Sequence, residues 1–221
     1  MRVFRGIARL FGELLVTLGV VLLLYAGWQL WWTDVVAVAD SRGAVALLER
    51  GFVGPEASRP EPAVPGEAFA VVRVPRFGPD FARPVYAGTT REVLMRGVGH
   101  YLGTAAPGEV GNFALAGHRT TWGKPFSQID RLREGDAVVV ETATGFSVYR
   151  VTASRIVSPD EVSVLLPVPG SPGAEPTTAM LTMTSCHPEF SSRERFVVHA
   201  RLDREYTRAD GLPEEVLEVS G

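Results

Sequence analysis

The 221-residue sequence contains a single cysteine, so no internal disulfide can stabilise the fold. It has no long basic run interleaved with aromatic residues, and its formal net charge is −3, which argues against nucleic acid as a partner. No cysteine and histidine cluster has zinc spacing, and neither a Walker loop nor the G-x-G-x-x-G fingerprint occurs. The sequence therefore implies no metal and no nucleotide cofactor, and its one thiol is free for chemistry.

One long apolar run is present near the N-terminus, from Leu14 to Trp32. As a helix, roughly 20 such residues cross a hydrocarbon core of about 30 Å. Arg2, Arg5 and Arg9 precede the run, and the positive-inside rule places that side in the cytoplasm. We therefore predict a cytoplasmic N-terminus over residues 1–13 and a single transmembrane anchor over residues 14–32, with the rest of the chain outside the cell membrane.

A cleaved signal peptide is the alternative interpretation of this run. The segment Ala37–Ala39 offers only a weak cleavage site, and the run is longer than the apolar core of a typical signal peptide. Both observations favour an uncleaved anchor.

The segment after the apolar run changes in character. Val35–Arg50 could form a short helix that leaves the membrane, and Gly51–Gly66 is rich in proline and glycine without an apolar period. Such a segment is either a spacer or a lid, and its polarity favours a spacer. We predict an extracytoplasmic linker over residues 33–68, a folded domain over 69–204, and a loosely ordered acidic tail over 205–221.

From Phe69 onward, short segments rich in β-branched residues are bounded by turn residues, which is typical of strands. The predicted strands are Phe69–Val74, Arg83–Gly88, Asn112–Gly117, Ala137–Thr142, Phe146–Val157, Ala179–Ser185 and Arg195–Leu202. Two short helical segments, Arg91–Arg96 and Phe126–Leu132, interrupt them. This spacing predicts an all-β, mainly antiparallel barrel or sandwich in place of a βαβ sheet.

Cys186 follows a predicted strand and shares one face of it with Thr182 and Thr184. Pro188 cannot continue a central strand, so we expect the thiol where a rigid strand gives way to a loop. The alternative is a small buried apolar residue, as most free cysteines are. A nucleophilic thiol would need a nearby histidine, because its usual pKa of about 8.5 leaves it mostly protonated at neutral pH.

The chain has four histidines. His118 directly follows an apolar predicted strand and is the preferred proton carrier, with His100, in another glycine-containing turn, as the reserve. His187 would point to the strand face opposite Cys186. His199 lies within an apolar strand and is expected to be structural.

Acyl transfer also needs a donor for the negative charge that develops on the scissile carbonyl. Arg193 and Arg195 lie at the start of the last predicted strand, and a hairpin-like return would bring that strand beside Cys186. A solvated surface arginine is the common alternative. Composition leaves the choice between the two arginines open.

Two blocks of the sequence resemble the signature blocks of sortases, most closely those of the actinobacterial class E. The blocks are GHYLGTAAPGEVGNFALAGHRTTWGKPF, which begins at Gly99, and LTMTSCHPEFSSRERFVVHARL, which begins at Leu181. The resemblance covers roughly Phe69 to Leu202. Sortases are cysteine transpeptidases on the outer face of Gram-positive membranes, and the resemblance implies their closed β-barrel of about eight strands with short helices.

The resemblance implies Cys186 as nucleophile, His118 as proton carrier and Arg195 as electrostatic stabiliser, and it favours Arg195 over Arg193. Methionine and serine stand at positions 183 and 185, where the family has leucine and threonine. Four nearby polar residues are expected to contact the substrate: Tyr101, Thr120, Thr184 and Ser185.

The resemblance also implies the reaction and the partners. The substrates would be surface proteins with a C-terminal LAxTG- or LPxTG-like sorting motif, cleaved between threonine and glycine through a cysteine thioester. The acceptor would be an amine of a peptidoglycan precursor or a pilin. A hydrolytic cysteine peptidase with the same residues and a non-catalytic, membrane-anchored β-barrel binding module are the alternatives.

Overall fold

The computed structural model describes residues 2–53 and 64–218. Within these ranges eight strands form a closed barrel in the order β1–β2–β3–β4–β7–β8–β6–β5. The strands are β1 (Ala68–Arg73), β2 (Ala82–Ala87), β3 (Val98–His100), β4 (Gly111–Ala116), β5 (Ala137–Thr142), β6 (Gly145–Val157), β7 (Ala179–His187) and β8 (Glu194–Thr207). The helical elements are α1 (Arg2–Phe52), α2 (Arg91–Leu94) and α3 (Glu214–Leu217), with short 3-10 turns η1 (Pro75–Phe77), η2 (Ile129–Arg131) and η3 (Val162–Leu165).

Six of the eight strand pairs in the described barrel are antiparallel, and the pairs β2–β3 and β4–β7 are parallel. The prediction of a mainly antiparallel closed barrel of about eight strands is therefore confirmed. The strand β3 was not predicted, because its three residues are too few to show alternation.

Apolar side chains fill the barrel interior. Phe113 and Leu115 of β4 and Leu181 and Met183 of β7 are fully buried in this cluster. Because side chains alternate along a strand, the residues between them face the outer surface of the barrel. The predicted catalytic residues belong to that outer surface.

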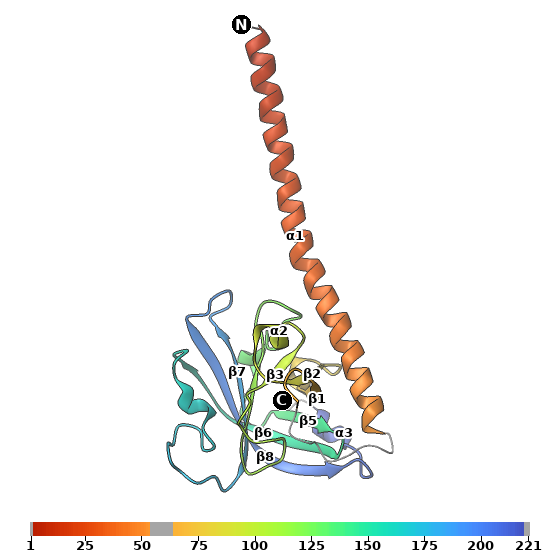
Figure 1. Ribbon diagram of the computed structural model, residues 1–221, viewed down its shortest axis with the longest axis vertical. Coiled ribbons are helices and arrows are strands. Elements are labelled where there is room, and N and C mark those ends of the chain that lie inside the picture. Colours follow the sequence, from red (N-terminus) through yellow and green to blue (C-terminus); the bar gives the residue numbers. More distant parts are fainter. Residues whose placement is uncertain (1, 54–63, 219–221) are drawn as a thin grey trace.

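The C-terminal part of α1 packs against the barrel wall, and its N-terminal part projects away from the barrel (Figure 1). Val45 and Phe52 of the helix form an apolar cluster with Val71 of β1. Glu49 of the helix forms an ion pair with Arg73 of β1. The helix thus covers the outer face of β1, which explains why successive valines of this strand are buried.

The N-terminal part of α1 contains a stretch, Phe4–Trp28, that is long and apolar enough to cross a membrane by length and composition. It overlaps the predicted anchor over residues 14–32, whose bounds stay a prediction. Val35–Arg50 is helical, as predicted, but it is the continuation of α1, which runs unbroken from Arg2 to Phe52, and not a short helix of its own. No proline or glycine lies between Trp32 and Val35, so nothing in the sequence ends the helix there.

Two further predictions concern segments at the edges of the barrel. Within the predicted linker over residues 33–68, most of the proline- and glycine-rich part Gly51–Gly66 lies outside the described residues. The prediction of a loosely ordered tail is wrong for its described part, because β8 extends to Thr207 and Val216 of α3 is buried. Val216 and the partly buried Tyr206 pack in an apolar cluster on β5 and β6, and this burial orders the segment.

Candidate active site

Three neighbouring strands, β4, β7 and β8, carry the predicted catalytic residues at one end of the barrel's outer surface. Cys186, near the end of β7, pairs directly with Arg195, near the start of β8. Directly paired residues on antiparallel strands project to the same face, with Cβ atoms about 4.5–5.5 Å apart. The predicted nucleophile and the predicted arginine are therefore neighbours across the ladder.

His118 stands just beyond the end of β4, which runs parallel to β7, and the ladder between these strands reaches Thr184. The pairing then continues for one more step. The Gly117 N–H donates to the Thr184 carbonyl at 3.1 Å, and the Ser185 hydroxyl donates to the Gly117 carbonyl at 2.8 Å. Extending this register by one residue places His118 beside Cys186.

Close packing holds the chain at this point. A Cβ on Gly117 would lie 2.6 Å from the ring of the fully buried Phe126, so a larger residue would displace one of them. The Phe126 N–H also donates to the His118 carbonyl at 3.1 Å. The loop of residues 119–125 is therefore closed at its base, directly at His118.

Burial determines the charge state of His118. Its Nε2 atom is buried and has no hydrogen-bond partner among the described residues. Burial lowers the pKa of this imidazole below its usual value of 6.5, because a low-dielectric surrounding disfavours the charged form. His118 is therefore neutral at neutral pH and can accept a proton.

Arg195 is held at the turn between β7 and β8. Its Nη1 donates to the carbonyls of Ser192 at 3.0 Å and Glu194 at 2.9 Å. These bonds orient the guanidinium and leave the N–H groups of Nε and Nη2 for a ligand. Arg193, the other candidate from the sequence, is exposed and precedes β8, so it has no ladder position beside Cys186.

A second arginine, which was not among the predicted site residues, lies beneath the site. Arg119 is only 4% exposed, and its Nη1 donates to the Cys186 carbonyl at 3.4 Å and lies 3.1 Å from His187 Nδ1. Asp130 balances its charge through an ion pair of 2.9 Å. Arg119 thus ties the loop after β4 to the end of β7. In the sequence, only its position directly after His118 indicated that Arg119 lies at the site.

The four predicted substrate contacts differ in their surroundings. Tyr101 is half-buried, and its hydroxyl lies 3.1 Å from that of Thr184. Thr184 and Ser185 are buried, and both hydroxyls donate to backbone carbonyls at the end of β4. These two residues hold β4 against β7. Tyr101 and Thr120, which is half-buried in the loop after His118, have partly exposed side chains that a substrate could reach.

Two other histidines point away from the thiol. His100, the reserve proton carrier, faces the barrel interior, where its ring packs against Phe69 and Phe113. His187 follows Cys186 on β7 and therefore projects to the opposite face, as predicted. Of the two candidate proton carriers, only His118 lies on the outer surface with the thiol.

His199 has a structural role, as predicted. Its Nδ1 lies 2.9 Å from the Thr182 hydroxyl, which donates to Asn112 at 2.7 Å. Burial, and to a lesser degree the charge of Arg155, lowers the pKa of His199 to about 4. The polar group is accommodated in the wall of the barrel as a neutral imidazole.

The lowered pKa of His199 predicts sensitivity to acid. Between pH 6.5 and about 4 the unfolded residue binds a proton that the folded residue does not, so the free energy of unfolding decreases as the pH falls. Between pH 7 and pH 5, His199 alone should reduce the free energy of unfolding by about 2 kcal/mol. Thermal unfolding of the full-length protein in detergent should therefore show a lower Tm at pH 5, and a His199→Gln variant should show a smaller decrease. Equal decreases would contradict the assignment.

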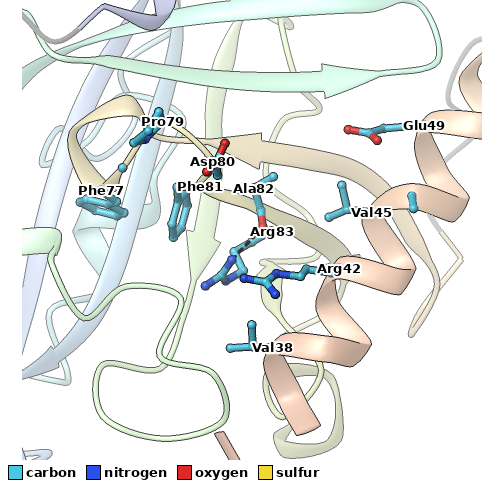
Figure 2. A pocket seen from close by; sticks show the side chains of 12 residues that line it. Val38, Arg42, Val45, Glu49, Phe77, Pro79, Asp80, Phe81, Ala82 and Arg83 are labelled. Carbon is cyan, nitrogen blue, oxygen red and sulfur yellow. Dashed lines mark hydrogen bonds between the residues drawn. The ribbon is translucent and has the colours of Figure 1, made fainter. Parts of the chain in front are cut away.

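A cavity of about 450 Å³ lies between α1 and the segment from Phe77 to Arg83. Figure 2 shows Arg42 of α1 and Arg83 of β2 side by side in this cavity. None of the predicted catalytic or substrate-binding residues lines it. The cavity belongs to the contact between helix and barrel and is separate from the candidate active site.

Comparison with known proteins agrees with the geometry. The family model of the Sortase domain matches residues 72–203. Sortase SrtE1 of Streptomyces coelicolor is 39% identical over an alignment of 218 residues that covers 95% of this chain and 61% of the relative. The solved structure of sortase E from Streptomyces avermitilis is 42% identical with a TM-score of 0.63, covering 69% of this chain and 99% of that chain. Sortase E1 from Streptomyces coelicolor, solved with a tripeptide in the active site, is 38% identical with a TM-score of 0.63, covering 71% and 99%.

The closed barrel has the fold of these sortases, which are cysteine transpeptidases, and the chain's cysteine lies near the end of its β7. The chain belongs to the sortase family. Its relatives among solved structures include sortases E, which confirms the predicted resemblance to class E. The chain spans 61% of the length of Sortase SrtE1.

Proposed function

We propose that the protein is a membrane-anchored sortase transpeptidase, with Cys186 as nucleophile, His118 as proton carrier and Arg195 as electrostatic stabiliser. The observation that carries this proposal is the strand register around Cys186. Cys186 pairs directly with Arg195 of β8, and on its other side the β4–β7 register leads to His118. A thiol between a neutral imidazole and a cation has the groups that acyl transfer needs.

The chemistry follows from these three groups. The Cys186 sulfur attacks the carbonyl carbon of the motif's threonine while the thiol proton passes to the neutral imidazole of His118. The threonine–glycine C–N bond then breaks, and His118 donates the proton to the departing amine, which leaves a thioester on Cys186. An incoming amine attacks the thioester and loses a proton to His118, and the released thiolate regains this proton.

Arg195 would stabilise the negative charge on the carbonyl oxygen during both attacks. Its Nη1 is already bonded to two backbone carbonyls, so the guanidinium is oriented before substrate binds. Preorganised donors of this kind stabilise a transition state more than mobile ones, because they need no reorganisation during the reaction.

The substrates we propose are surface proteins with a C-terminal LAxTG- or LPxTG-like motif, and the acceptor is an amine of a peptidoglycan precursor or a pilin. The tripeptide in the active site of the Streptomyces coelicolor relative supports a peptide-binding role for the corresponding surface. Tyr101 and Thr120 are the proposed substrate contacts with partly exposed side chains.

We propose a single-pass topology in the cell membrane, with the N-terminus in the cytoplasm and the barrel outside. The apolar stretch Phe4–Trp28 of α1 supports the anchor. The arginines among the first nine residues support the orientation, because positively charged residues favour the cytoplasmic side.

The test uses the full-length protein in detergent or nanodiscs, mixed with an LAETG-type peptide or its LPETG analogue and a glycine-based amine. Mass spectrometry should detect the threonine–glycine exchange product, and a Cys186→Ala control should lack it. Hydrolysis without exchange would favour the cysteine peptidase. No reaction with either peptide, in a protein shown to be folded, would favour the binding module.

A further inference from the structure

The loop that follows His118 contacts α1 just beyond its apolar stretch. The Gly123 N–H donates to Asp34 Oδ1 at 3.3 Å, and Lys124 Nζ forms an ion pair with Asp34 Oδ2 at 2.5 Å. A Cβ on Gly123 would also lie 3.5 Å from the Ala37 Cβ, so helix and loop are in close approach. One carboxylate of the anchor helix thus holds two consecutive residues of this loop.

The same part of the loop has an unusual backbone. Trp122, Gly123 and Lys124 all have positive φ angles, of 55°, 73° and 47°. The two residues with side chains adopt this conformation at an energetic cost, and it persists only where the surroundings hold it. Asp34 is such a support, because it binds a backbone N–H and a side-chain charge within the same turn.

The loop is coupled to the active site at its other contacts. At its base the Phe126 N–H bonds to the His118 carbonyl, and Arg119 reaches the Cys186 carbonyl. The segment between these contacts is short, so a displacement of residues 122–124 moves His118 and Arg119 as well. The position of the proton carrier therefore depends on where α1 holds the loop.

The Asp34 contact is not what attaches α1 to the barrel. The attachment lies farther along the helix. It consists of the apolar cluster around Val45 and Phe52 and the ion pair of Glu49 with Arg73. A partly exposed ion pair such as that of Asp34 with Lys124 contributes little to global stability. Its removal should change the loop without detaching the helix.

We propose that Asp34 is a positioning residue for catalysis, through which the membrane-anchor helix holds loop 119–125 and keeps His118 in register with Cys186. The part of this inference that concerns catalysis rests on the proposed function. Its consequence is that α1 is part of the catalytic unit as well as a tether.

The experiment compares variants of the full-length protein in nanodiscs. Asp34→Asn preserves the shape of the side chain and removes its charge, and it should lower kcat for peptide exchange about three- to tenfold. KM for the peptide and the Tm should stay near the wild-type values. Glu49→Gln is the matched control, because it breaks an ion pair of the same helix with the barrel and should leave kcat unchanged. A charge exchange, Asp34→Lys with Lys124→Asp, should recover part of the kcat that Asp34→Lys alone loses.

Hydrogen–deuterium exchange over residues 119–126 provides a readout that needs no substrate. Amide exchange in this loop should accelerate in Asp34→Asn and stay unchanged in Glu49→Gln. The proposal would be overturned if hydrogen–deuterium exchange in the loop were unchanged in Asp34→Asn, or if both variants lost kcat equally. If the wild type gives no exchange product while Asp34→Asn still loosens the loop, the proposed function fails and the positioning of the His118 loop by Asp34 stands.

Discussion

Replacing Cys186 with alanine should abolish thioester formation and reduce peptide exchange by a factor on the order of 10⁴ or more. The variant has no nucleophile beside His118 and Arg195, and the chain has no second cysteine to replace it. Intact-protein mass spectrometry should show the acyl-enzyme mass in the wild type and its absence in the variant. Product analysis should show that the variant has also lost peptide exchange.

The Cys186→Ala result is interpretable because the barrel should tolerate the change. Cys186 is only partly buried and lies near the end of β7, outside the interior cluster. The Tm of the variant should therefore be close to that of the wild type. Substantial exchange activity in a folded Cys186→Ala protein would show that the thiol is not the nucleophile.

Replacing His118 with asparagine should lower kcat for exchange by about 10²- to 10⁴-fold, the usual contribution of a positioned general acid–base group. Asparagine can still hydrogen-bond but cannot carry a proton between the thiol, the leaving amine and the acceptor amine. Single-turnover kinetics should show both acylation and aminolysis slowed, because His118 transfers a proton in each step.

The matched control for His118 is His187→Asn, because His187 lies on the opposite face of β7 from the thiol. His187→Asn should lower kcat for peptide exchange much less than His118→Asn does. In the wild type, burial lowers the pKa of His118, so its neutral form persists to a pH below 6.5. The rate of acylation, which needs no free amine, should therefore begin to fall only at a pH below that value. Equal losses for the two histidine variants would contradict the role of His118.

Local patterns in the sequence were enough to predict most strands and the thiol's place on them. Alternation along Ala179–Ser185 put Cys186 on one face with Thr182 and Thr184, and the following proline indicated where the strand ends. The same reasoning placed His187 opposite Cys186. These predictions depend only on neighbours in sequence, and the structure bears them out.

Two features of the barrel were not readable from local patterns. The three residues of β3 are too few to show alternation, so this strand was not predicted. The strand β1 was predicted, but the burial of its outer face under α1 was not. The tail is ordered because Val216 finds an apolar cluster on β5 and β6. Whether such a segment is buried or ordered depends on the surface against which it packs, and the residues of the segment alone do not determine that surface.

By itself, the sequence determined the apolar N-terminal helix, the all-β character of the domain and the candidate groups Cys186, His118 and Arg195. Only the tertiary structure decided how they relate: the β7–β8 register beside Cys186, the inward direction of His100, and the contact of Asp34 with the His118 loop. The physical reason is that alternation defines two faces of a strand, but only closure of the barrel decides which face is buried. Contacts between distant segments, such as α1 and the loop after β4, likewise arise only when those segments pack together.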